Sequence, residues 1–131
     1  MGIVLIAEDD DRAFEEMFVE TLEEMGVTVI RAKTLQEGIE MFDANKEQLS
    51  GVVVDGCLNN RHILDGLDLV EHIRRQGWGG IIIPASQSDD NNERMVQLGA
   101  TRKPYASGFR VEKESAINLL RREMRKAKIF A

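Results

Sequence analysis

The sequence predicts an α/β domain built on a parallel sheet, and three observations support this fold class. Short apolar runs rich in Val and Ile recur along the chain, at residues 3–7, 27–30, 52–54 and 81–83. The runs are continuous rather than alternating, which is typical of strands buried on both faces. Segments with helical periodicity lie between the runs, and this alternation favours a parallel sheet with helices on both faces.

Five segments carry the patterns of helices, and they are 12–25, 34–42, 66–76, 88–99 and 112–128. Thr34 and Glu37 stand at the spacing of a capping box, which predicts a helix start. Gly26 and Gly77 follow the last apolar positions of two segments, as glycines that end helices do. We therefore expect a single domain over 1–131, because no linker, repeat or low-complexity run divides the chain.

The bulk composition excludes several function classes. A net charge of -6 and an aromatic share of 5% disfavour direct nucleic-acid binding. No stretch approaches the roughly 20 apolar residues that a membrane helix needs. Cys57 is the single cysteine, so no internal disulfide is possible and a reducing, cytoplasmic location is expected.

Polar residues follow the predicted strands, where open α/β sheets bind ligands. Those residues are Glu8, Asp9 and Asp10 after the first strand, Asp55 after the third, and Ser86 and Lys103 after the fourth. Carboxylates that converge without His or Cys form an all-oxygen site suited to Mg²⁺. One carboxylate can instead act as a nucleophile and form an aspartyl phosphate, with a lysine and a hydroxyl binding the phosphoryl oxygens.

The same polar residues also allow simpler interpretations in which they have only structural roles. The acidic run from Glu8 to Asp11 also fits a solvated helix N-terminus, which is the favoured interpretation for Asp10 and Asp11. Asp55 precedes a glycine and could begin a turn, and Ser86 could cap a helix.

The stretches VLIAEDD, VVVDGC, LDGLDLVEHIRR, IIIPAS and GATRKPY together resemble the receiver domain of bacterial two-component response regulators, along nearly the whole chain. The resemblance implies a single three-layer αβα domain with no separate output domain. It also implies a doubly wound, five-stranded parallel sheet of flavodoxin-like order 2-1-3-4-5.

The resemblance implies a role for each matching residue. Glu8 and Asp9 match the acidic pair that holds Mg²⁺, and Asp10 would then be the cap of the first helix. Asp55 matches the phosphoacceptor, which is also a metal ligand, and Cys57 matches the position whose backbone carbonyl completes the metal site. Two further matches bind the phosphoryl group: Ser86 through its hydroxyl, and Lys103 through its ammonium. The family's lysine–proline bond is usually cis.

Several features depart from the family's pattern. The loop over 55–66 is longer than usual, and 99–103 is too short for a full fifth strand. The position of the family's aromatic switch residue holds Ala100, for which Tyr105 is a candidate substitute. Pro84 removes a hydrogen-bond donor from a strand that should be interior.

The expected function is that of a phosphorylatable receiver, not an enzyme with its own substrate. A sensor histidine kinase or histidine phosphotransfer protein would phosphorylate Asp55 with Mg²⁺, and output would follow through protein binding or phosphorelay. The alternative is a pseudo-receiver, a protein-interaction module independent of phosphorylation. A phosphatase of the haloacid dehalogenase type is disfavoured, because Cys57 stands where such enzymes need a second aspartate. A dinucleotide site is disfavoured because the first strand is followed by acids instead of glycines.

Overall fold

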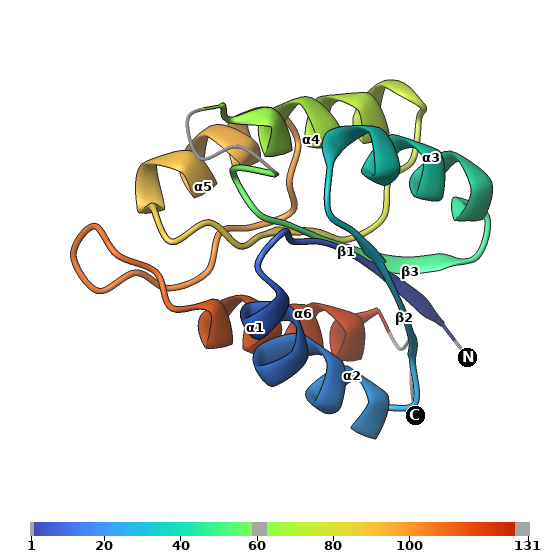
Figure 1. Ribbon diagram of the computed structural model, residues 1–131, viewed down its shortest axis with the longest axis horizontal. Helices are drawn as coiled ribbons and strands as arrows, with labels where there is room; N and C mark the ends of the chain where they lie inside the picture. Colours follow the sequence, from blue (N-terminus) through green and yellow to red (C-terminus); the bar gives the residue numbers. More distant parts are fainter. Residues whose placement is uncertain (1, 59–62, 128–131) are drawn as a thin grey trace.

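Apolar runs and amphipathic segments assemble into three layers, with a parallel sheet between two layers of helices (Figure 1). The computed structural model describes residues 2–58 and 63–127. Part of the long loop predicted over 55–66 therefore lies outside the described residues. The four strands are β1 (Ile3–Ala7), β2 (Thr28–Ala32), β3 (Leu49–Val54) and β4 (Ile82–Pro84), in the order β2-β1-β3-β4.

Helices cover both faces of this sheet. One face carries α3 (Leu35–Asn45), α4 (Asp65–Arg75) and α5 (Asp89–Gln97). The other face carries α6 (Lys113–Lys126) and a first helical stretch made of α1 (Asp11–Ala13), the π-helix η1 (Phe14–Val19) and α2 (Glu20–Glu24). The predicted fold class is thus confirmed.

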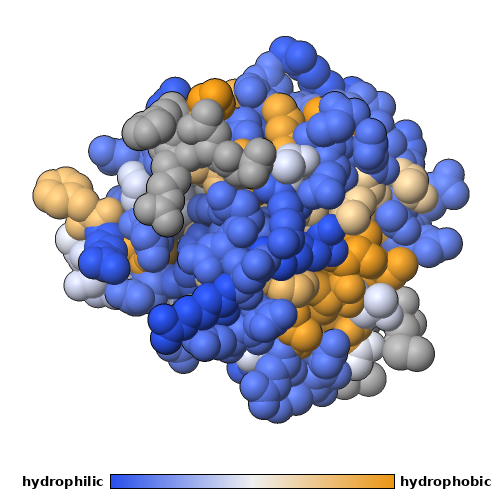
Figure 2. Space-filling model, in the orientation of Figure 1, coloured by the Kyte–Doolittle hydropathy of each residue, from blue (hydrophilic) through white to orange (hydrophobic). Residues whose placement is uncertain are grey.

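Each face of the sheet packs on its own hydrophobic core. Leu5, Val52 and Ile82 point into the core under α3, α4 and α5. Their neighbours in the strands, such as Ile6 and Val53, point into the core under α2 and α6. Both sets are buried because successive side chains of a strand alternate between its faces. The surface presented in Figure 2 is mainly hydrophilic, as this division predicts.

Local signals in the sequence set the helix starts. Asp10 caps α1, since its carboxylate accepts hydrogen bonds from the backbone N–H groups of Arg12 and Ala13 at 2.9 and 3.1 Å. Thr34 caps α3 by accepting a hydrogen bond from the N–H of Glu37 at 3.1 Å. The caps expected at Asp10 and Thr34 are confirmed.

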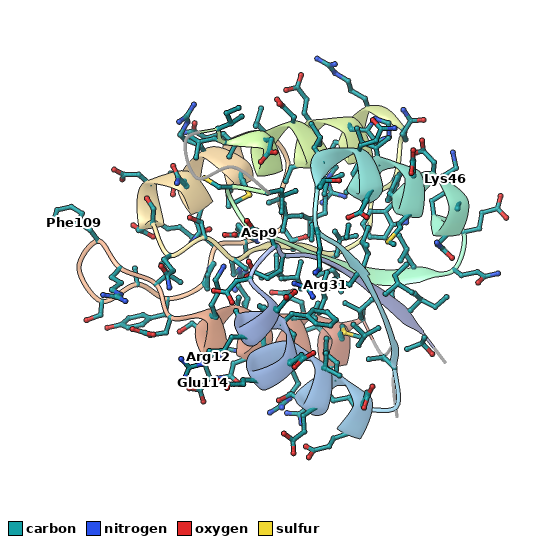
Figure 3. All side chains as sticks on the ribbon, viewed as in Figure 1. Asp9, Arg12, Arg31, Lys46, Phe109 and Glu114 are labelled. Carbon is teal, nitrogen blue, oxygen red and sulfur yellow. The ribbon has the colours of Figure 1, made fainter. Side chains whose placement is uncertain are left out.

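The sheet has the first four strands of the predicted order 2-1-3-4-5, and the predicted fifth strand is not formed in the described residues. Residues after α5 instead cross the edge of β4. Thr101 donates its N–H to the carbonyl of Ile82 at 2.8 Å, and the N–H of Ile82 bonds to the Thr101 hydroxyl at 2.9 Å. The chain then forms a tight turn between Ser107 and Arg110, from whose tip Phe109 projects (Figure 3).

This arrangement explains Pro84. The N–H of Ala85 donates to Val54 on β3 at 2.8 Å, so the backbone of Pro84 faces the opposite side, where a fifth strand would lie. β4 is an edge strand of this sheet, and proline is tolerated at an edge because no ladder partner needs its missing N–H.

Among the described residues, none of the helices combines the length and the apolar character needed to cross a membrane.

Candidate functional site

Three neighbouring strands end at one edge of the sheet and bring together residues from distant parts of the sequence. Glu8 follows β1 and donates its N–H to Ala32 at 3.0 Å, and Asp55 follows β3 and donates its N–H to Ala7 at 2.9 Å. Ser86 lies just beyond β4. The strand ladder therefore fixes the backbone of the two acidic residues directly.

The carboxylates of Glu8, Asp9 and Asp55 form a cluster. Each offers one oxygen atom, and these atoms all lie within 4.8 Å of one another. Glu8 and Asp55 also line a cavity of about 340 Å³, together with Cys57, Ser86 and Lys113. The structure thus brings together five of the residues singled out from the sequence, which are Glu8, Asp9, Asp55, Cys57 and Ser86.

Lys113, the first residue of α6, reaches this cluster although sequence reasoning did not single it out. Its buried ammonium lies 2.7 Å from Glu8 Oε1 and 3.0 Å from Asp55 Oδ1, and it donates a hydrogen bond to the carbonyl of Ala85. Three oxygen atoms from three strand ends therefore hold one cation.

Lys103 lies elsewhere, which corrects its predicted position in the site. Its ammonium pairs with Asp89 and Glu93 on α5 at 3.3 and 3.1 Å, and the two carboxylates raise its pKa. The described residues contain no cis peptide bond, so the bond before Pro104 is trans. The short segment 99–103 places Lys103 too early in the chain to reach Asp55, whereas the start of α6 returns to the sheet edge. The short length of this segment was visible in the sequence, and it could have indicated that Lys103 does not occupy the usual position of the lysine in the site.

The electrostatics of the cluster are those of a buried, crowded anion site. Glu8 is 1% exposed, and burial raises its pKa from 4.5 to about 7, opposed by the ammonium of Lys113 and reinforced by Asp55. Burial also raises the pKa of the Cys57 thiol, with added repulsion from Asp55. A thiol held protonated is a poor metal ligand.

Asp11 separates from its acidic neighbours. It forms ion pairs with Arg31 at 2.7 Å and Lys33 at 2.9 Å, and hydrogen bonds from Lys33 and Arg31 lower its pKa. The acidic run of the sequence therefore divides into two cluster residues, a helix cap at Asp10 and a surface ion pair at Asp11.

The site fits Mg²⁺ by its donor set. Glu8 Oε1 is buried and accepts no hydrogen bond of good geometry, although the Lys113 ammonium lies close to it. Oxygen ligands alone, from Glu8, Asp9 and Asp55, match the preference of a hard divalent cation. Three carboxylates share one ammonium in this cluster, so a further cation at this place would reduce the repulsion among them.

Ser86 is buried beside the acidic cluster, with its hydroxyl against the backbone of Gly56. A Cβ atom added to Gly56 would lie 3.2 Å from the Ser86 hydroxyl oxygen. The hydroxyl accepts a hydrogen bond from the N–H of Ser88 at 3.1 Å. Tyr105 is 81% exposed, and Ala100 is buried.

Comparison with known proteins agrees with this geometry. No protein-family model and no curated protein matches the sequence. The structure is similar to the Francisella response regulator 1452 receiver domain, with 22% identity, a TM-score of 0.74, and coverage of 98% of this chain and 100% of that chain. A response regulator receiver domain protein from Clostridium thermocellum gives a TM-score of 0.76 at 18% identity, with 98% of each chain covered.

The chemotaxis protein CheY4 from Vibrio cholerae gives a TM-score of 0.69 at 20% identity, covering 94% of this chain and 98% of that chain. The chain has the fold of receiver domains, as its motifs indicated.

Proposed function

We propose that this protein is a cytoplasmic receiver domain of two-component signal transduction, phosphorylated on Asp55 by a sensor histidine kinase or histidine phosphotransfer protein with Mg²⁺. The observation that carries the proposal is the position of Asp55. Its carboxylate belongs to the three-carboxylate cluster that could hold a cation, and it also pairs with the ammonium of Lys113 at 3.0 Å. A carboxylate nucleophile next to a lysine ammonium and a metal site is suited to attack an anionic phosphoryl group.

The chemistry is a transfer between two side chains. A carboxylate oxygen of Asp55 attacks phosphorus, a P–O bond forms, the P–N bond of the partner's phosphohistidine breaks, and the imidazole leaves. Bound Mg²⁺ would neutralise charge between the carboxylates and the phosphoryl oxygens. The metal ligands in this proposal are Glu8, Asp9, Asp55 and the backbone carbonyl of Cys57.

Two further residues bind the transferred group. Lys113 already holds Asp55 Oδ1 at 3.0 Å and can follow the new oxygens with a short movement. Ser86 supplies a hydroxyl donor at the end of β4. Lys113 takes the role that the sequence assigned to Lys103. The domain assists its own phosphorylation and dephosphorylation, with no separate substrate, and its output is protein binding or phosphorelay.

The described residues form no fifth strand, which favours one alternative, a pseudo-receiver that binds partners without phosphorylation. Receiver domains are expected to change in this region on activation, so the difference speaks for a module with a different output surface. The complete acidic cluster speaks for phosphorylation.

Intact mass after incubation with acetyl phosphate separates the two functions. We expect the protein to gain one phosphoryl group in Mg²⁺ and none in chelator, and Asp55→Asn to gain none. Lys113→Met should slow the gain strongly, whereas Lys103→Met, a matched loss of one ammonium, should leave it unchanged. No gain in any condition would leave the pseudo-receiver as the function. Equal effects of the two lysine variants would contradict the assignment of phosphoryl binding to Lys113.

A further inference from the structure

Asn92 on α5 is a fully buried polar residue whose side chain is bonded to the backbone of Ser86. Asn92 Oδ1 accepts the N–H of Ser86 at 2.9 Å, and Asn92 Nδ2 donates to the carbonyl of Ser86 at 2.9 Å. One amide group thus satisfies both polar groups of one residue's backbone. The same pair of groups would otherwise be buried without partners.

These bonds lie on the side of the sheet where a fifth strand is missing. Ile82, Pro84 and Ser86 are two residues apart, so their backbone groups face the same side of β4 and its extension. Thr101 bonds to Ile82, Pro84 has no N–H, and Asn92 bonds to Ser86. The Asn92 amide therefore replaces the backbone of a neighbouring strand at the residue that carries the site's hydroxyl.

Ser86 is joined to the start of α5 by further contacts. Its hydroxyl accepts the N–H of Ser88, and Ser88 caps α5 by accepting the N–H of Asn91 at 3.3 Å. Asn92 itself donates its N–H to the carbonyl of Ser88 at 3.1 Å. Ser86 cannot be displaced toward Asp55 without either displacing the first turn of α5 or breaking both bonds to Asn92.

We propose that Asn92 is a positioning residue that sets the Ser86 hydroxyl for the phosphoryl group and transmits its displacement to α5. The inference rests on the proposed function, because it needs a phosphoryl group on Asp55. It assigns the coupling between Ser86 and α5 to a side-chain amide, at a sheet edge where the described residues form no fifth strand.

The test compares hydrogen exchange of the α5 backbone amides with and without phosphorylation from acetyl phosphate and Mg²⁺. Intact mass on the same samples gives the fraction phosphorylated. In the wild type we expect phosphorylation to change the exchange rates of α5 by at least about fivefold, the lower end of common coupling between sites. In Asn92→Ala the phosphoryl group is still gained, more slowly, and the rates of α5 no longer respond to it.

Thr101→Val is the matched control. It removes the acceptor for the N–H of Ile82 at the same sheet edge without touching Ser86, so it disturbs the same edge of β4 by one buried hydrogen bond. We expect it to keep the full response of α5. Asn92→Ser, which is too short to bond both backbone groups of Ser86, replaces Asn92→Ala if the alanine variant does not fold, and it should likewise lose the response.

The outcomes distinguish the inference from the function on which it rests. A wild type that gains no phosphoryl group overturns the proposed function and the inference with it. A wild type that is phosphorylated without any response in α5 overturns the inference alone. The inference alone is also overturned if a phosphorylated Asn92 variant shows the wild-type response in α5. It is likewise overturned if Thr101→Val loses the response in α5 as fully as the Asn92 variants do.

Discussion

Lys113 is held at the site by its position at the start of α6 and by three acceptors. It is the first residue of α6, so its side chain leaves the helix where the axis meets the sheet edge. Glu8, Asp55 and the carbonyl of Ala85 then surround its ammonium. A buried cation paired with two carboxylates keeps its charge because removing the proton would leave two anions uncompensated, and the pKa of Lys113 is accordingly raised.

Lys113→Met should destabilise the protein because it leaves Glu8 and Asp55 side by side without a cation. Removing one partner of a buried ion pair costs about 3 kcal/mol, and we expect a loss of this order in urea unfolding at pH 8. The loss should shrink at pH 5, where Glu8 is protonated, and Mg²⁺ should restore part of it. Lys103→Met is the control and should change stability less, since its ion pairs with Asp89 and Glu93 are partly exposed to solvent. Equal losses in the two variants would contradict the assignment.

Glu8 should make the stability of the metal-free protein fall as pH rises. Its folded pKa of about 7 exceeds the ordinary value of 4.5, so the folded state holds this proton more tightly than the unfolded state. Between these values the unfolded chain has released the proton and the folded chain has not, so the free energy of unfolding decreases with pH and levels off above about 7.

Urea unfolding in chelator at pH 5, 6, 7 and 8, for the wild type and Glu8→Gln, isolates this contribution. The side chain at position 8 is uncharged at all of these pH values in the glutamine variant. We expect the wild type to lose up to about 3 kcal/mol relative to Glu8→Gln across the window. A constant difference between the two proteins would show that Glu8 titrates with an ordinary pKa.

At the scale of elements, the start of α4 supports the phosphoacceptor through Gly66. A Cβ atom at this position would lie 1.9 Å from the carbonyl oxygen of Asp55, and the N–H of Gly66 donates to Gly56 at 3.0 Å. The glycine is required by the close approach of two backbones, since its φ is not in the left-handed region. The dipeptide Asp65-Gly66, part of the motif seen in the sequence, thus positions the loop that carries Asp55.

Gly66→Ala should displace that loop or the first turn of α4. We expect a loss of about 2 kcal/mol or more in thermal or urea unfolding, because the atom it meets is backbone and cannot rotate away. Phosphorylation of Asp55 should slow as well. Gly79→Ala is the matched control, since an added Cβ there meets nothing within 4 Å. A Gly66→Ala variant as stable and as reactive as Gly79→Ala would contradict the structure at this contact.

The elements that the sequence predicted are those whose signals are local. Apolar runs predicted the four strands, and the caps at Asp10 and Thr34 marked two helix starts. The fifth strand followed only from the resemblance and is absent from the described residues. Pro84 was a local sign of this absence, because an interior strand would need the N–H that it lacks.

The site was predictable where side chains directly follow strands. Glu8, Asp9, Asp55 and Ser86 lie where the ladder fixes them, so their convergence followed from the parallel sheet alone. Lys113 and Asn92 come from helices, and their reach depends on how each helix packs against the sheet. Sequence spacing does not determine that packing, so Lys103 was chosen in place of Lys113, and Asn92 was overlooked.

At the scale of the whole molecule, the site joins all three layers. The sheet supplies the acidic residues, α6 on one face supplies Lys113, and α4 and α5 on the other face supply Gly66 and Asn92 (Figure 1). A ligand that binds only the folded arrangement therefore stabilises contacts across the entire domain, and its effect should appear in global unfolding.

Mg²⁺ should raise the melting temperature of this protein through the acidic cluster. At a Mg²⁺ concentration one hundred times the dissociation constant, the gain is about 2.7 kcal/mol, which for a domain of this size corresponds to about 10 °C. The net charge of -6 also makes the protein sensitive to ionic strength, so NaCl of equal ionic strength is the necessary reference. Asp9→Asn removes one proposed ligand and should lose most of the gain in Mg²⁺ while keeping the response to NaCl. If wild type and Asp9→Asn gain equally, Mg²⁺ acts by screening the surface charge, and the cluster of Glu8, Asp9 and Asp55 is not its binding site.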